Sequence, residues 1–274
     1  MTKDSLGDRM KGYEGVPRTR LIPKVPVMIR LDGKAFHTFT RGMPRPYHRP
    51  FHECMWEAAR YLCEHIQGCQ LAYVQSDEIT LLLLDTMSLE AEGWFGYEVQ
   101  KMASVAASLC TAAFNAALLT GNEMDGLPAL AAFDARVWNI PKTEVTNAFV
   151  WRQQDATRNA IQMVGQSKFS QKELHGVSCA QIQELLFQKH QVNFNDLPVP
   201  QKRGVCIVKE YYEITKKEGF LVSPGGVVVS GAVAEYVKRS RWHVDENIPI
   251  FTQDRGYVEK YLFATSSEEE VSGH

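Results

Sequence analysis

Two apolar, β-prone runs in the first third of the chain meet carboxylates at turns. Residues 25–31 run into Asp32 and Gly33, and a second pair of apolar runs flanks Asp77 and Glu78. Carboxylates at the ends of neighbouring strands can converge, and their mutual repulsion then calls for a proton or a hard cation. Mg²⁺ is the usual cation where phosphate is the substrate. Taken singly, Asp32-Gly33 also fits an ordinary turn, so the prediction rests on the two elements together.

The elements that would position these carboxylates alternate between strand and helix periodicity. Apolar spacing predicts the order strand, helix, strand, strand, helix, strand, at residues 25–31, 51–66, 71–75, 79–85, 94–119 and 132–140. This β-α-β-β-α-β order predicts an α+β fold, a ferredoxin-like palm domain of the polymerase and cyclase type. The fold alone does not decide the function.

Further helices and strands follow the palm as additions. Helices are expected at 143–162 and 178–191, a strand at 205–208, and a hairpin that pairs 210–214 with 220–222. The predicted division is a palm-type catalytic domain at 1–140, a C-terminal part packed on it at 141–265, and a disordered tail at 266–274.

Composition sets limits on the class of protein. The chain has 274 residues, 45% hydrophobic residues and a formal net charge of −2, which describes an ordinary globular protein. This net charge argues against a protein coated with positive charge, but not against a local basic groove for nucleic acid. The six cysteines form no CxxC pair, which predicts free thiols. With no signal peptide and no apolar span of membrane length recognised, we expect a cytoplasmic protein without a membrane partner.

A family resemblance rests on the same two stretches. The run Arg30-Leu31-Asp32-Gly33-Lys34-Ala35-Phe36-His37, followed by Tyr73-Val74-Gln75-Ser76-Asp77-Glu78, resembles the tRNA-His guanylyltransferase family. That family includes Thg1-like proteins, which are reverse (3′-to-5′) nucleotide polymerases. Weaker similarity extends from about residue 9 to residue 209.

The resemblance implies a set of site residues. Catalytic residues would be Asp32, Asp77 and Glu78, and two Mg²⁺ ions would be held by Asp32, Asp77 and the carbonyl of Gly33. The implied nucleotide site comprises Asp32, Gly33, Lys34, Ala35, Phe36, His37, Ser76, Asp77, Lys101 and Asn159. In this interpretation Gly33 lets the backbone approach the phosphates, and the amides after it cradle the triphosphate.

Basic residues farther along the chain are candidate contacts to tRNA. They are Arg152, Arg158, Lys202, Arg203 and Lys209, and each fits an ordinary solvated surface position equally well. The resemblance also implies ATP and GTP, or other nucleoside triphosphates, as substrates. A homodimer or homotetramer would share the tRNA.

One departure from the family pattern bears on the reaction. Eukaryotic members carry a His-Ile-Asn-Asn-Leu-Tyr-Asn signature in the helix that begins Trp151-Arg152-Gln153, whereas this chain has Thr157-Arg158-Asn159-Ala160-Ile161-Gln162-Met163. The departure favours template-directed repair of truncated tRNA 5′ ends over obligate addition of G to tRNA-His. Two other classes stay open. One is a different palm enzyme, such as a nucleotidyl cyclase or conventional polymerase, and the other is a tRNA-binding protein without activity.

Overall fold

The computed structural model describes residues 5–86, 92–121, 130–215 and 236–263. In chain order the elements are α1 Ser5–Gly15, β1 Val27–Gly33, α2 Phe36–Phe39, α3 Arg49–His65, β2 Cys69–Gln75, β3 Glu78–Leu83, η1 Trp94–Tyr97, α4 Val99–Thr120, β4 Phe133–Asn139, η2 Lys142–Glu144, α5 Val145–Gln166, α6 Gln171–Leu174, α7 Cys179–His190, η3 Phe194–Asp196, α8 Val199–Arg203, β5 Val205–Thr215, β6 Tyr236–Asp245 and α9 Gly256–Glu259.

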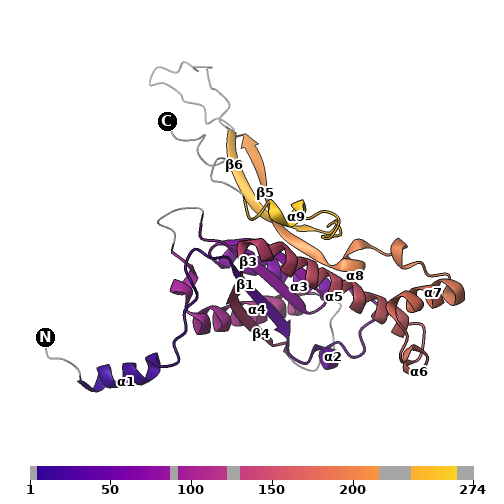
Figure 1. Cartoon of the computed structure of the whole chain (residues 1–274), viewed down its shortest axis with the longest axis horizontal. Coiled ribbons are helices and arrows are strands. Elements are labelled where there is room, and N and C mark those ends of the chain that lie inside the picture. Colours follow the sequence, from indigo (N-terminus) through magenta and orange to yellow (C-terminus); the bar gives the residue numbers. More distant parts are fainter. Residues whose placement is uncertain (1–4, 87–91, 122–129, 216–235, 264–274) are drawn as a thin grey trace, which may run out of the picture.

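A single antiparallel sheet organises the chain (Figure 1). Its six strands lie in the order β4-β1-β3-β2-β5-β6, and every neighbouring pair is antiparallel. The first four strands reproduce the ferredoxin-like order, so the predicted palm fold is confirmed. β5 and β6 continue the same sheet, so the C-terminal part shares its hydrogen-bonded framework with the palm.

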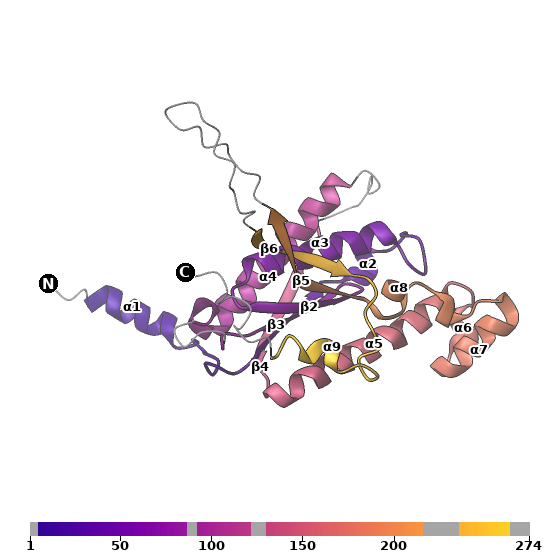
Figure 2. The ribbon, with the colours of Figure 1, turned by 90° about the horizontal axis from the view of Figure 1, so that it is seen from above.

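Helices cover both faces of this sheet. Figure 2 shows α3 and α4 on one side and α5 and α9 on the other. On the first side, Ile29, Leu31 and Leu81 are fully buried in a core with α3 and α4. On the second, Met28 and Leu82 are buried against α5 and α9. Successive strand residues point to opposite faces, so one apolar run serves both cores.

Helix α4 departs from one expectation. Val99–Thr120 is long and apolar enough to cross a membrane, with a mean hydropathy of 1.6, although no span of that kind was recognised in the sequence. Its inward residues, including Cys110 and Phe114, are 0% exposed in the core beneath the sheet. We therefore interpret α4 as a core helix of the palm.

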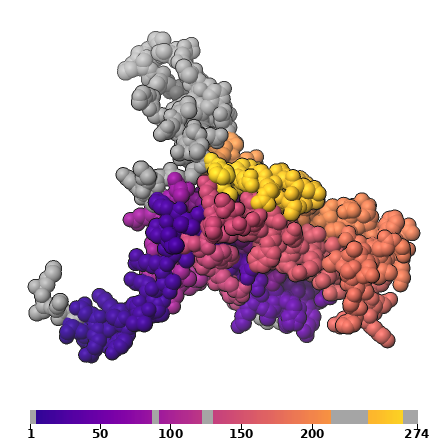
Figure 3. Space-filling view, in the orientation of Figure 1, coloured from indigo at the N-terminus to yellow at the C-terminus, as the bar shows by residue number. Residues whose placement is uncertain are grey.

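Two peripheral segments also differ in detail from the predictions. β5 does form a hairpin, but its partner is β6 rather than residues 220–222, which lie outside the described residues together with the predicted tail at 266–274. Helix α1 has no buried residue and stands clear of the body (Figures 1 and 3). All six cysteines are free, as predicted.

Candidate active site

Strand register sorts the α5 face of the sheet into rows, because directly opposite residues on neighbouring strands share a face. The row at the turn end is Asp134, Asp32, Glu78 and Gln75. The next row on this face is Arg136, Arg30, Thr80 and Tyr73, and the third is Trp138, Met28, Leu82 and Leu71. An acidic row, a row headed by two arginines and an apolar row thus follow one another from the turn into the core.

The acidic row adjoins the two-residue turn Ser76-Asp77. Ser76 adopts φ 48°, a left-handed conformation of the kind found at functional turns. The backbone N–H of Gly33 donates to the carbonyl oxygen of Asp77 at 3.1 Å, which fixes the turn beside the end of β1. Asp32 and Asp77, far apart in sequence, therefore lie in one pocket, as the sequence predicted.

Burial and charge make the ionised form of Asp77 costly. Desolvation, with a contribution from the nearby Asp32 carboxylate, raises the pKa of Asp77 to about 6. A bound cation would remove that cost, because it compensates both carboxylates at once.

The oxygen atoms that converge at the turn are of the type that Mg²⁺ prefers as ligands. The part of the chain that the structure describes contains no group of three or more His, Cys, Asp or Glu side chains arranged to hold a metal. Asp32 and Asp77 supply two hard carboxylates, and Mg²⁺ ordinarily takes one or two of these and fills its remaining positions with phosphate and water. The Gly33 carbonyl stays a predicted third ligand.

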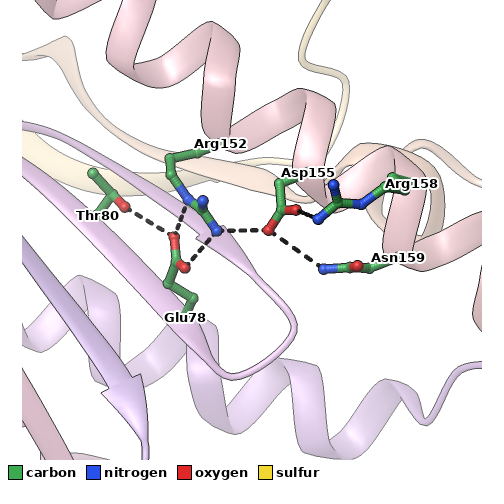
Figure 4. Close-up of polar contacts among 6 residues, drawn as sticks. All are labelled: Glu78, Thr80, Arg152, Asp155, Arg158 and Asn159. Carbon is green, nitrogen blue, oxygen red and sulfur yellow. Dashed lines mark hydrogen bonds and ion pairs between the residues drawn. The ribbon is translucent and has the colours of Figure 1, made fainter.

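Arg152 requires a correction, because it is not the exposed surface side chain that the predicted contact to tRNA assumed. It is 7% exposed, and its Nε and Nη2 donate to the two Glu78 oxygens at 2.7 Å each. Nη2 also donates to Asp155 at 2.8 Å, and Asp155 in turn binds Arg158 and Asn159 (Figure 4). Arg152 therefore neutralises Glu78 from α5 and ties the hairpin of β2 and β3 to that helix. Glu78 is occupied by this ion pair, which suits a supporting role better than direct metal ligation.

A cavity of about 570 Å³ opens in front of the acidic row. Its lining comes from the sheet, from the turn, from α5, from the first turn of α3 with the segment before it, and from the corner between α8 and β5. The predicted residues that line it are Asp32, Ser76, Asp77, Glu78, Arg152, Asn159 and Arg203. This volume is in the range of small-molecule sites.

The α8–β5 corner brings Arg203 into the cavity lining. Gly204 has φ 78°, and a Cβ there would lie 2.3 Å from the carbonyl oxygen of Val74, so only glycine allows this close approach. Tyr73 Oη donates to the Arg203 carbonyl at 2.6 Å and holds the corner against β2. Arg203 Nε is buried and has no hydrogen-bond partner among the described residues.

Arg30, Arg136, Tyr47 and His52 are among the lining residues that were not predicted. Arg30 and Arg136 lie opposite each other on β1 and β4, and Tyr47 stacks on His52 with ring centroids 4.0 Å apart. Burial lowers the pKa of His52 to about 4, and its Nδ1 donates to the His48 carbonyl, which leaves Nε2 as an acceptor. The alternation around Asp32 placed Arg30 on the same strand face, but only the register reveals Arg136.

Other predicted nucleotide contacts lie outside the cavity lining. Lys34 and His37 are exposed, and Phe36 is buried among Phe39, Phe51, Phe114 and Phe133, so its side chain faces the core. The Lys34 amide already donates to the Ala132 carbonyl at 2.8 Å. Ala35 is exposed in a left-handed conformation before α2. Of the predicted amide cradle, the N–H groups of residues 35–37 have no acceptor among the described residues.

Lys101 does not reach the cavity within its own chain. It lies in the first turn of α4, 3.9 Å from Glu98. Asn115, near the other end of α4, bonds to Ala131 just before β4, beside the acidic row. At ~1.5 Å per helical residue the intervening length is roughly 21 Å.

The remaining basic candidates lie at varied places. Arg158 pairs with Asp155, and Lys202 donates to the Asn195 carbonyl. Lys209 lies on β5 beyond Val208, which pairs with Leu71, so it sits toward the far end of the sheet from the turn.

Packing also requires glycine at position 33, which the sequence did not indicate. A Cβ at this position would lie 2.3 Å from the Phe36 ring. The glycine thus lets the buried aromatic cluster close directly behind the acidic row.

Comparison with known proteins places the chain among nucleotidyltransferases. A family model described as tRNAHis guanylyltransferase matches residues 7–141. A bacterial tRNA(His) guanylyltransferase (Thg1)-like protein in complex with ATP is 40% identical with a TM-score of 0.81, over 94% of this chain and 99% of that one. One in complex with GTP is 39% identical with a TM-score of 0.76, over 95% and 100%. The tRNA(His) guanylyltransferase of Schizosaccharomyces pombe is 28% identical over 216 residues, 73% of this chain and 79% of that relative.

Proposed function

The chain belongs to the tRNA-His guanylyltransferase family of nucleotidyltransferases, and we propose that it repairs truncated tRNA 5′ ends by template-directed 3′-to-5′ nucleotide addition. The observation that carries this proposal is the cavity that unites the Asp32–Asp77 turn with the α5 face. Similar bacterial proteins are described in complex with ATP and with GTP, which supports a nucleoside triphosphate as the occupant.

Metal chemistry enters through the acidic row. Two Mg²⁺ ions held by Asp32, Asp77 and the Gly33 carbonyl would, when bound, neutralise the triphosphate and activate the attacking hydroxyl. The protein's own contribution is positioning. Arg152 keeps Glu78 neutralised and holds α5 against the hairpin, and the amides of residues 35–37 offer donors to phosphate oxygens.

The proposed reaction extends the RNA at its 5′ end. The 3′-hydroxyl of the incoming nucleotide attacks the 5′-phosphorus of the RNA, so that an O3′–P bond forms and the bond to the leaving group breaks. A 5′-triphosphate end releases pyrophosphate. A 5′-monophosphate end is first adenylylated with ATP, which releases pyrophosphate, and then releases AMP in the attack. Pairing with the opposite strand selects the nucleotide.

The proposal of 5′-end repair, rather than addition of G to tRNA-His, is based on the sequence of α5. Asn159, Ala160, Gln162 and Met163 line the cavity where eukaryotic members carry the His-Ile-Asn-Asn-Leu-Tyr-Asn signature. This difference faces the nucleotide cavity directly, so it bears on substrate choice. We further propose that Arg158, Lys202, Arg203 and Lys209 contact RNA phosphates, and that a homodimer or homotetramer shares the tRNA.

A nucleotide-addition assay with Mg²⁺, ATP and GTP tests the proposal on two tRNA-His substrates. One is full-length with a 5′-monophosphate, and the other lacks its first nucleotide but keeps the 3′ strand to copy. We expect preferential restoration of the paired nucleotide on the truncated RNA, and the same on a truncated tRNA of another specificity.

Two outcomes contradict the proposal. Addition of G to full-length tRNA-His alone would identify a dedicated tRNA-His guanylyltransferase. No addition to any substrate would favour another palm-type nucleotidyl enzyme, detected by cyclic nucleotide or 3′ extension, or a tRNA-binding protein without activity.

A further inference from the structure

Two arginines face each other across β1 and β4 on the α5 side of the sheet. Arg30 and Arg136 are directly opposite in the register, an arrangement of like charges that destabilises a sheet. Arg136 forms a long ion pair with Asp134, at 3.6 Å, and both side chains are more than half exposed, so the ion pair offsets little of this repulsion. Arg30 forms no ion pair with any residue that the structure describes. The pair therefore carries a repulsive cost that an anion placed between the two guanidinium groups would remove.

An exposed tryptophan adjoins Arg30. Trp151, on α5, is 54% exposed although it is a large aromatic side chain. The guanidinium carbon of Arg30 lies 5.8 Å from its ring centroid, and that of Arg152 lies 4.4 Å away. Because Arg152 is fixed by Glu78 and Asp155, the tryptophan is held by a rigid neighbour. More than half of its surface is left for a planar partner.

The positions of these three side chains relative to the cavity favour a polynucleotide as their ligand. Arg30 and Arg136 belong to the cavity lining, whereas Trp151 lies outside it. A mononucleotide beside Asp32 and Asp77 would have no need of Trp151, whereas a polynucleotide whose end enters the cavity would extend beyond the lining, where Trp151 adjoins Arg30. Exposed aromatic rings beside arginines are the usual means of holding unpaired bases.

We infer that Arg30, Arg136 and Trp151 form a platform for the end of the RNA substrate, in which a base stacks on Trp151 and the arginines bind backbone phosphates. This inference rests on the proposed function, because it specifies how that site takes its polymer substrate. It assigns RNA recognition to the β4–β1 side of the cavity, separate from the α8–β5 corner.

RNA binding can be measured without turnover. The probe is a 5′-truncated tRNA with a fluorophore at its 3′ end, titrated with the full chain and followed by anisotropy. We expect Trp151→Leu to weaken binding by roughly 5- to 100-fold, the effect of losing one stacked base, and Trp151→Phe to retain most of the affinity. Phe187→Leu is the matched control, because Phe187 is 59% exposed on α7, away from the cavity lining. Affinity for ATP should be unchanged in these three variants, because Trp151 and Phe187 lie outside the cavity lining.

Charge variants test the phosphate contacts. Arg30→Gln and Arg136→Gln should each reduce the slope of log Kd against log salt by about one, whereas Lys172→Gln on α6 should leave it unchanged. Because each variant removes a like-charge neighbour, the melting temperature without RNA should not fall, which a structural role would predict.

Clear results overturn the inference. Wild-type RNA affinity in Trp151→Leu, or ATP affinity lost in parallel with RNA affinity, would remove the platform from RNA recognition. Wild-type protein that binds no RNA would overturn the inference and the repair function together. RNA bound through the platform without any nucleotide addition would contradict the proposed function alone.

Discussion

The two faces of the sheet are built from the same strands but serve different ends. Toward α3 and α4, Leu31 and Leu81 are 0% exposed in a continuous apolar core. Toward α5, their chain neighbours Asp32 and Thr80 belong to the acidic row and the arginine row. The comparison teaches that the α3–α4 face is apolar along its whole length, whereas the α5 face keeps an apolar core at one end and tolerates unfavourable charge at the turn end. Variants of the apolar core and of the acidic turn should therefore have opposite effects on stability and activity.

The largest effect is expected at Asp77. Asp77→Asn should lower nucleotide addition by on the order of 10³-fold or more, because the cation site loses a carboxylate. The free energy of unfolding should not fall, since the carboxylate is costly to ionise where it lies. Turnover assays and denaturant unfolding measure both quantities. Wild-type activity in this variant would remove Asp77 from the metal site.

Arg152 should respond differently, because it joins the charged face to α5. Arg152→Gln leaves Glu78, 7% exposed, without its ion-pair partner, and should cost about 3–5 kcal/mol of unfolding free energy. The double variant with Glu78→Gln should recover part of that loss, because the stranded charge is gone. Denaturant unfolding measures the free energy of unfolding of the single and the double variant. A double variant no more stable than Arg152→Gln alone would contradict this account.

The apolar face should lose stability without losing chemistry. Leu81→Ala removes a fully buried side chain and should cost about 2–5 kcal/mol. Nucleotide addition per folded molecule should stay near the wild-type value at a temperature well below the transition. A turnover defect as large as that of Asp77→Asn would show that the two faces are not functionally separate.

The smallest effect concerns pH. Asp77 has a raised pKa, near 6, so its contribution to stability in the metal-free protein is present below its unfolded pKa and is lost as the pH rises from about 4 through 6. Asp77→Asn should lack that loss, which a comparison of unfolding free energies across this window measures. In turnover assays the activity should fall as the pH drops through this region, with an apparent pKa that decreases as Mg²⁺ is raised, because the metal competes with the proton. An apparent pKa independent of Mg²⁺ would exclude Asp77 as a ligand.

Local sequence patterns predicted the palm fold and the acidic turn because both depend on short-range signals. An alternating apolar run, a helical period and a turn can each be recognised from residues that are close together in the sequence. The arginine row was missed because it depends on which strands are neighbours, and Arg30 and Arg136 are distant in sequence. Arg152 was assigned to tRNA because nothing near it in sequence indicates that its partner is Glu78, 74 residues away.

Helix polarity accounts for a further difference between prediction and structure. Lys101 was grouped with the nucleotide site on the basis of the resemblance, yet it lies at the end of α4 opposite Asn115, which is bonded beside the start of β4. A periodic pattern identifies which face of a helix is buried, but not which end approaches a site formed by other elements.

The alternation of rows has a consequence for quality control during folding. A slip of one residue between β1 and β3 would turn Leu31 toward α5 and drive Asp32 into the aromatic cluster behind it, so the slipped pairing would lose both the cation site and the core. A chain with the wrong register therefore cannot keep the apolar core while losing only the cation site. The register that buries the core also places Asp32 and Glu78 side by side at the turn. A molecule that folds stably therefore also has these carboxylates in their correct positions.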